Sequence, residues 1–373
     1  SRPHPVNDYQ VGSIREEFDF GPVTLVQLAA VRESIRKWGA LADSPGCGWY
    51  DVRLKVSLDY PVFHLRELLY AVTTDTAVAG QFTYVDPRNY SLQKALEEIA
   101  TAHLRRLGAC LAPVFCDLPH SEETFQVEAS VVIPVRNRVH TIAEAVQSAM
   151  DQETDFPFNV LVVDNHSSDG TTAVLAEMAN QHAALCHEIP LRRDLTIGGC
   201  WNEAVFSGNC GRYAVQLDSD DLYSSPHTLQ KIVDLLRSGQ YAMVIGSYTL
   251  VNSRQEEIPP GLIDHREWTE VNGRNNALRI NGFGAPRAFN TSVLRQNPFL
   301  NVGYGEDYAM ALRLSRQYRI GRIYENLYWC RRWEGNSDAA LTITQKNQYD
   351  AFKDQLRTLE IMARQELNGH AKQ

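Results

Sequence analysis

Residues 212–226 read RYAVQLDSDDLYSSP, and this stretch decides how the rest of the chain is interpreted. The apolar run 213–217 predicts a buried strand. It leads directly into Asp218, Ser219, Asp220 and Asp221. Three carboxylates within four residues repel one another and lose hydration when they lie near a core. A hard divalent cation, Mg²⁺ or Mn²⁺, held by Asp220 and a neighbouring carboxylate would offset that repulsion.

A simpler alternative exists for the same acidic turn. Aspartate also favours Asx-turns and the first positions of helices, so the turn could be followed by a solvated helix start. The position of the turn, directly after an apolar strand in a series of strands and helices, favours the metal site.

Strands and helices alternate from residue 128 onward. We expect strands over 129–133, 159–163, 184–189 and 213–217, and helices over 141–150, 169–181 and 201–206. Such alternation requires crossover connections, and it predicts an α/β fold with a mostly parallel sheet and helices on both faces. Ligands of such sheets bind at the carboxyl ends of the strands. Since Pro134, Asp164 and Asp218 lie at three of these ends, we expect the functional site there.

The flanking segments have a different pattern. On the carboxyl side we expect a helix over 225–238, a strand over 243–250, a loop over 252–288, and helices over 306–318 and 346–367. On the amino side we expect helices over 24–41 and 91–107, the second with Ser91 as its N-cap. Val52, Leu54 and Val56 alternate within 49–58, which predicts a half-buried strand.

Composition excludes several classes of function. The formal net charge of −9 argues against a nucleic-acid binder with a broad basic face. The seven cysteines are scattered and form no CxxC pair, which is typical of reduced thiols in a cytoplasmic protein. Because no apolar run reaches the length of a membrane span, we expect no transmembrane segment. A peripheral position at the inner membrane face and a homo-oligomeric state are left open.

Three further groups carry polar chemistry, each with a structural alternative. Asp164 opens DNHSSDGT, where it can accept hydrogen bonds from a base or ribose, although such a turn is also an ordinary helix cap. Glu306 and Asp307 begin a predicted helix, where a carboxylate is either a cap or a general base. The trio 331–333, RRW, can bind phosphate and stack on a sugar, or simply pack at the surface.

The order of these motifs is more specific than any one of them. The chain reads VVIPVRN (131–137), VVDNHSSDGT (162–171), IGGCWN (197–202), LDSDD (217–221), GED (305–307) and RRW (331–333). This order resembles that of the family 2 glycosyltransferases, which have the GT-A fold and act on nucleotide sugars. The resemblance covers about residues 128–340. It implies a catalytic domain over 127–345, with a nucleotide-binding half (127–224) and an acceptor half (225–345). An N-terminal extension (1–126) and a C-terminal helix (346–373) lie outside that domain.

The resemblance also implies roles for individual residues. Asp307 would be the catalytic base, and Asp220 would hold Mn²⁺ or Mg²⁺ on the diphosphate. The residues implied for binding the nucleotide-sugar donor are Pro134, Arg136, Asn137, Asp164, Arg193, Gly198, Asn202, Asp218, Ser219 and Arg332. Two departures from the family pattern stand out. The Asn-rich segment appears as GGCWN, and the QxxRW pattern of processive enzymes is incomplete because Tyr328 or Trp329 stands near the Gln position.

The implied activity is an inverting glycosyl transfer from a nucleotide-diphosphate sugar, with a UDP-sugar favoured, to a saccharide or glycoconjugate acceptor. Three other functions are weighed against it. A sugar nucleotidyltransferase would have a Gly-rich loop after its first strand, whereas this chain has PVRNR. A phosphohydrolase would carry its nucleophilic Asp on the first strand of its domain, whereas the acidic turn of this chain follows about three earlier strands. A catalytically silent binding or scaffold protein is disfavoured by the intact DSDD and GED motifs.

Overall fold

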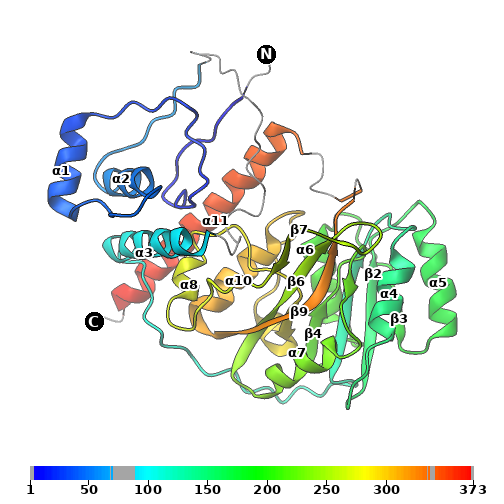
Figure 1. The fold of residues 1–373 in the computed structure, drawn as a ribbon. Helices are drawn as coiled ribbons and strands as arrows, with labels where there is room; N and C mark the ends of the chain where they lie inside the picture. Colours follow the sequence, from blue (N-terminus) through cyan, green and yellow to red (C-terminus); the bar gives the residue numbers. More distant parts are fainter. Residues whose placement is uncertain (1–3, 68, 70–88, 334, 337–340, 371–373) are drawn as a thin grey trace. The chain divides into compact units, whose positions relative to one another are not determined.

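The computed structural model describes residues 4–67, 69, 89–333, 335–336 and 341–370. The chain divides into two compact units (Figure 1). The helical unit comprises residues 1–114, 267–282 and 337–373, and the sheet unit comprises residues 115–266 and 283–336. Within the described ranges, no helix is long and apolar enough to cross a membrane.

The sheet unit is built on a nine-stranded sheet with the order β3-β2-β1-β4-β8-β6-β9-β5, and β7 pairs with β6 (Figure 1). Its strands are β1 (Ala129–Val135), β2 (Phe158–Asp164), β3 (Leu185–Glu188), β4 (Tyr213–Gln216), β5 (Leu222–Tyr223), β6 (Tyr241–Val251), β7 (Glu257–Ile263), β8 (Arg287–Asn290) and β9 (Arg319–Arg331). Its helices are α4 (Ile142–Met150), α5 (Thr171–Gln181), α6 (Ile197–Phe206), α7 (Thr228–Arg237), α9 (Thr291–Gln296) and α10 (Glu306–Gln317). The predicted α/β fold is confirmed, and so are the four predicted strands before residue 218.

The first half of the sheet is parallel. β1 pairs in parallel with β2 and β4, and β2 with β3. The chain runs outward through α4 and α5 to β3, and then returns through α6 to β4 on the other side of β1. Because such crossovers are right-handed, this reversal places α6 on the face opposite α4 and α5. The carboxyl ends of β1 and β4 therefore meet at the topological switch point, where α/β sheets bind their ligands.

The second half of the sheet is mixed rather than parallel. β8 enters antiparallel between β4 and β6, β6 and β9 run parallel, and β5 and β7 pair antiparallel at the margins. Residues 252–288 were predicted to be a loop, and this is wrong in part, since they contain β7 and the short helix α8 (Gly273–Asn276). The Pro259–Pro260 pair hid β7, because proline is depleted in strands and is tolerated chiefly at their edges.

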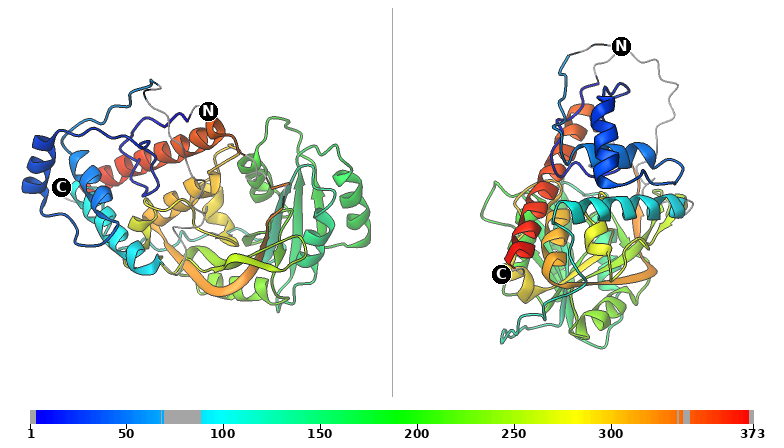
Figure 2. Two further views of the ribbon diagram at one scale, coloured as in Figure 1. Left: turned by 45° about the horizontal axis from the view of Figure 1, so that its top comes forward. Right: turned by 90° about the vertical axis from the view of Figure 1, so that its left-hand side faces the viewer.

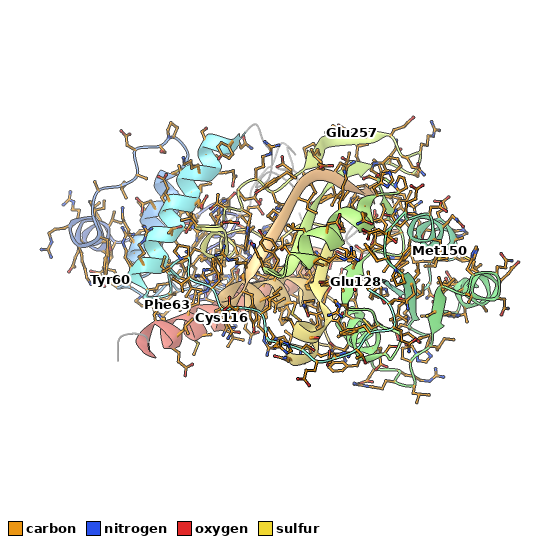
Figure 3. The ribbon with its side chains drawn as sticks, turned by 90° about the horizontal axis from the view of Figure 1, so that it is seen from below. Tyr60, Phe63, Cys116, Glu128, Met150 and Glu257 are labelled. Atoms are coloured by element: carbon orange, nitrogen blue, oxygen red, sulfur yellow. The ribbon has the colours of Figure 1, made fainter. Side chains whose placement is uncertain are left out.

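Burial explains why the parallel strands read as continuous apolar runs. β1 and β2 are covered on both faces, and their aliphatic residues are almost completely inaccessible. Ion pairs lie at the opposite, amino ends of these strands. Glu128, which precedes β1 and is labelled in Figure 3, pairs with Arg237 Nε of α7 (3.1 Å) and Arg212 Nε (3.4 Å). Charge at the amino ends is thus paired, whereas the carboxyl ends carry the acidic turn.

The helical unit contains α1 (Leu28–Trp38), α2 (Gly48–Val56), α3 (Tyr90–Arg106), α8 and α11 (Ile343–His370), and Figure 2 shows two further views of it. The strand predicted over 49–58 is wrong, because these residues form α2. The apolar alternation misled because Asp51, Arg53 and Lys55 are buried instead of facing solvent. Asp51 and Lys55 pair with each other, and Arg53 donates to the Ser13 carbonyl (3.0 Å). Lys55 Nζ lies 2.7 Å from Asp51 one turn away. Ser91 is not an N-cap either, since α3 begins at Tyr90 and its N-cap is Asn89.

Buried ion pairs join the separate segments of the helical unit. Asp354 of α11 is fully buried and accepts from Ser13 Oγ (3.0 Å), Arg15 Nε (3.1 Å) and Arg357 (2.8 Å). Arg279, from the segment 267–282, is buried and pairs with Glu16. These charges replace part of the apolar core that a unit assembled from three segments would otherwise need.

Candidate active site at the carboxyl ends of β1 and β4

The acidic turn 218–221 joins β4 to β5 and is fixed by one backbone N–H and one carboxylate, each hydrogen-bonded to β9. The Asp218 N–H donates to Tyr328 Oη of β9 (2.9 Å), and the Arg331 N–H donates to Asp221 Oδ1 (2.8 Å). Because β5 follows the turn directly, the alternative of an acidic cap on a helix is wrong. Asp221 is buried in this backbone network, whereas Asp218 and Asp220 keep part of their surface accessible.

The side chain of Asp220 contacts residues from the first and the last part of the sheet unit's sequence. Its Oδ2 lies 3.3 Å from Trp333 Nε1, 3.3 Å from Asn336 Nδ2 and 3.6 Å from Arg138 Nε. The Arg331 guanidinium donates to the Asp220 carbonyl and to Glu144 of α4. The RRW trio therefore lies beside the acidic turn, as its place in the motif order implied. Within it, the backbone N–H of Arg332 donates to the Val251 carbonyl of β6 (2.7 Å).

The second predicted acidic motif lies at the start of α10. Gly305 caps this helix in a left-handed conformation (φ 78°), followed by the buried Glu306 and the partly exposed Asp307. Asp307 Oδ2 lies 2.7 Å from Arg287 of β8. A carboxylate at the amino end of a helix is stabilised by the helix dipole, and here it also has a cationic partner.

Gln216 links the two acidic motifs. It is the last residue of β4 and is buried. Its Nε2 donates to Asp218 Oδ1 (2.8 Å), and its Oε1 accepts from the Arg287 N–H (3.1 Å). The structure thus connects Asp218 through Gln216 and Arg287 to Asp307, and it brings together two motifs that are far apart in the sequence.

The electrostatics of this group favour a cation. Burial raises the pKa of Asp221, and the charges of Asp218 and Asp220 add to that effect. Burial also raises the pKa of Asp218, and Arg287 and Gln216 offset only part of the rise. Burial together with the charge of Asp307 raises the pKa of Glu306 to about 8. The negative charge of the carboxylates in the acidic turn is therefore larger than the neighbouring arginines compensate.

The carboxylate oxygens at this turn suit a hard divalent cation such as Mg²⁺ or Mn²⁺. Asp220, with its accessible carboxylate, is the residue that fits as a ligand, and the negative charge around Asp218 would favour a cation at this turn. Across the described part of the chain, no cluster of three or more His, Cys, Asp or Glu side chains forms a complete ligand set. A metal here would therefore take its remaining oxygen ligands from water or a bound phosphate group, as Mg²⁺ commonly does.

Asp164 ends β2 and is fully buried. Its Oδ1 accepts from the Ser167 N–H (3.0 Å), and its Oδ2 accepts from Thr172 Oγ1 (2.5 Å) and lies 3.4 Å from His187 Nε2. Burial opposes ionisation, but hydrogen bonds from His187, Thr172 and Ser167 outweigh it and hold the pKa of Asp164 well below its usual range. In this structure the carboxylate orders the turn after β2.

The loop after β1 is tied to that same turn. Asn137 has a positive φ (55°), and its Oδ1 accepts from the Ser168 N–H (2.8 Å) while its own N–H donates to Ser167 Oγ (2.9 Å). Pro134 lies opposite Val163 in the β1–β2 register, and Arg136 is exposed beyond the end of β1. Ser219 is buried, and its carbonyl accepts from Thr141 Oγ1 (2.9 Å).

Two residues predicted to bind the donor lie in the packing of α6. A Cβ on Gly198 would come within 1.8 Å of the Leu300 carbonyl oxygen, so the helix can approach residues 300–302 only with glycine there. The Asn202 amide exchanges two hydrogen bonds of 2.9 Å with the backbone of Phe299. Arg193 lies apart from both on the exposed loop before α6. Gly198 and Asn202 therefore position the chain that leads into α10.

The contacts of several residues at the site were not predicted from the sequence. Gln216 is a polar residue at the end of an apolar strand, and that contrast is the signal that could have identified it. Arg138 and Tyr328 lie inside motifs that were quoted, but nothing in their spacing indicated contact with the acidic turn. Arg287 was expected from chain order, with His265 and Trp268, to shape the acceptor pocket, but no signal in the sequence indicated its contact with Asp307.

Residues 130–300 match the family model described as glycosyl transferase family 2. This segment is a family 2 glycosyltransferase domain. The matched range of the glycosyltransferase domain contains Asp164, the turn 218–221 and Arg287, whereas Asp307 follows a few residues beyond its end.

Known proteins similar to this chain include an uncharacterized protein of Mycobacterium tuberculosis and one of Mycobacterium bovis. Each is 32% identical over 108 residues, which make up 29% of this chain and 31% of the relative. The match thus spans less than a third of the length of these curated relatives.

Among solved structures, the chain is similar to TarS 1–349 of S. aureus in complex with UDP-GlcNAc, with 21% identity and a TM-score of 0.48 over 64% of this chain and 72% of that one. It is also similar to the mannosyltransferase PcManGT from Pyrobaculum calidifontis in complex with GDP-Man and Mn²⁺. That likeness has 17% identity and a TM-score of 0.44, over 75% of this chain and 84% of that one.

Proposed function

We propose that the chain is a metal-dependent, inverting glycosyltransferase that moves a sugar from a nucleotide-diphosphate sugar, with a UDP-sugar favoured, to a saccharide or glycoconjugate hydroxyl. The observation that carries this proposal is the connection from Asp218 through Gln216 and Arg287 to Asp307. It supports the proposal because Asp218, which we assign to face the nucleotide, and Asp307, which we assign as the base, share one polar network in a sheet whose sequence matches glycosyl transferase family 2.

Asp307 is the carboxylate we assign as the base. A general base must be ionised and within reach of the proton that it takes. Glu306 is buried, and with a pKa of about 8 it is neutral at pH 7, so it fails both conditions. The accessible Asp307 would take the proton of the acceptor hydroxyl, on the side of the sugar opposite the departing diphosphate.

Asp220 is the residue we assign to the metal. When bound, Mn²⁺ or Mg²⁺ would offset the negative charge of the departing diphosphate. Trp333, Asn336 and Arg138 orient the Asp220 side chain, and Arg331 fixes its backbone.

We assign the remaining predicted donor residues to two kinds of action. Asp218 and the exposed Arg136 and Arg193 would contact the nucleotide directly, the arginines through its negative charge. Asp164 and Asn137 would act through the turn that they order. Gly198, Asn202, Pro134, Ser219 and Arg332 would likewise act by fixing the backbone around the donor.

The test is a thermal-shift panel of UDP, GDP, CDP and dTDP, each with and without Mn²⁺, on the wild type, Asp220→Asn and Asp307→Asn. A ligand specific for the folded state adds about 2.7 kcal/mol at a hundredfold excess over its dissociation constant. We expect a metal-dependent shift with one nucleotide that is lost in Asp220→Asn and kept in Asp307→Asn, together with loss of sugar transfer in Asp307→Asn.

Asp155→Asn is the matched control, because Asp155 is an exposed aspartate paired only at the amino ends of the strands. It should behave as the wild type does. Absence of a shift with every nucleotide would contradict the transferase assignment and point to a silent scaffold. Retained transfer in Asp307→Asn would show that another group is the base.

A further inference from the structure

We propose that Arg287 exchanges partners during the reaction: it neutralises Asp307 while the donor site is empty and turns to the diphosphate once a donor is bound. The inference rests on the function proposed above. It assigns a positioning and charge-handling role to a residue that lies in none of the donor motifs.

The first support is the set of charges around Arg287. Its guanidinium lies 2.7 Å from Asp307 Oδ2, and the carboxylates of Asp218 and Glu306 also act on its charge. One cation is therefore shared between the carboxylates of Asp307 and Asp218, beside the neutral Glu306, at the point where a diphosphate would add further negative charge. About 17% of the Arg287 side chain and 28% of the Asp307 side chain are accessible, so a ligand can reach the pair.

The second support is that Arg287 is held by contacts that do not involve Asp307. Its N–H donates to Gln216 Oε1 (3.1 Å), and its Nη1 donates to the Gly284 carbonyl (2.9 Å). Gly284 has φ 94°, and a Cβ there would lie 2.7 Å from the His265 ring, so the backbone can present this carbonyl to Arg287 only with glycine at position 284. Because these two contacts do not depend on Asp307, Arg287 can lose Asp307 as a partner and stay at the site to take a new one.

The third support is chemical. A carboxylate in a close ion pair is a weaker proton acceptor, because the cation stabilises its charged form. A planar guanidinium also matches phosphate oxygens well and can bind two of them at once. A donor diphosphate that attracts Arg287 would therefore free Asp307 to act as a base only when there is a sugar to transfer.

The exchange is consistent with the balance of the reaction. The acceptor oxygen forms a bond to the anomeric carbon, and the bond from that carbon to the diphosphate breaks with its electron pair on the phosphate oxygen. The hydroxyl proton passes to Asp307. Arg287 keeps its proton throughout and stays beside the charge that develops on the diphosphate.

The experiment is calorimetric binding of UDP, GDP and inorganic pyrophosphate, each with Mn²⁺, to the wild type, Asp307→Asn, Arg287→Gln and the double variant. If Asp307 competes with the diphosphate for Arg287, Asp307→Asn should bind the preferred nucleoside diphosphate about fivefold to tenfold more tightly than the wild type, within the usual range for coupled neighbours. The gain should disappear in the Arg287→Gln background. Arg287→Lys keeps the positive charge but lacks the planar guanidinium. In that background Asp307→Asn should give only part of the gain in affinity.

Arg237→Gln supplies the control, since Arg237 is an arginine that pairs with Glu128 and Asp155 at the amino ends of the strands. In that background the gain from Asp307→Asn should be unchanged. If Asp307→Asn binds no more tightly, Asp307 does not compete with the diphosphate for Arg287. If the gain persists without Arg287, simple charge repulsion between Asp307 and the diphosphate suffices. Either outcome overturns the exchange while the proposed function stands. If no nucleoside diphosphate binds the wild type, the proposed function itself fails.

Discussion

At the scale of single residues, burial alone does not decide the state of a carboxyl group. Asp164 and Glu306 are both buried, yet the pKa of Asp164 is lowered and that of Glu306 is raised to about 8. Asp164 receives hydrogen bonds from three residues, which stabilise its charged form, whereas Glu306 adjoins the negative charge of Asp307. The neighbouring groups therefore decide the ionisation state: they keep the buried Asp164 charged and the buried Glu306 neutral.

His103 of α3 gives a prediction at this scale. Burial, with the charge of Arg106, lowers the pKa of His103 to about 3. The unfolded chain takes up this proton below pH 6.5, whereas the folded protein does not until about pH 3. The contribution of His103 to stability is therefore complete above pH 6.5 and falls by about 2 kcal/mol at pH 5. Urea unfolding of the wild type and His103→Gln between pH 5 and 7.5 checks this, and equal pH dependence in both would contradict it.

At the scale of elements, the alternation of apolar strands and helices was enough to predict the parallel half of the sheet. The acidic turn could also be placed at a strand end, because that position follows from the local pattern. The strand predicted over 49–58 is wrong because an ion pair allows Asp51 and Lys55 to be buried, and hydrogen bonds to backbone carbonyls allow Arg53 to be buried. The contact of Gln216 with Arg287 could not be predicted, since it depends on β8 entering beside β4, which no local pattern encodes.

The approach of α6 to residues 300–302 gives a prediction for that element. A methyl group at Gly198 would overlap the Leu300 carbonyl, and such overpacking costs about 1–3 kcal/mol. Gly198→Ala should lower the thermal midpoint and, by shifting the start of α10, weaken nucleotide binding. Gly208→Ala, at a site with no neighbour within 4 Å, should leave both measurements nearly unchanged. Equal stability of the two variants would show that α6 moves freely at this contact.

At the scale of the whole molecule, the helical unit depends on charges as well as on apolar contacts. Removing one partner of a buried pair costs about 3–5 kcal/mol, whereas an exposed pair contributes up to about 1 kcal/mol. Asp354 and Asp234 are a matched set, because each pairs with an arginine three residues later, the first fully buried and the second exposed. Asp354→Asn should therefore lower the free energy of unfolding severalfold more than Asp234→Asn, as measured by urea denaturation. Similar losses would mean that water reaches the Asp354 cluster.

The interleaving of the two units has a consequence for the history of the chain. The polypeptide passes from one unit to the other after residues 114, 266, 282 and 336. A unit formed by one continuous stretch can be gained or lost by a single recombination event, whereas an event that transfers the helical unit complete must also carry the sheet unit that lies between its segments. Any event confined to residues 1–114 would separate Glu16 from Arg279 and leave a buried charge without its partner. The three segments are therefore bound to be inherited together.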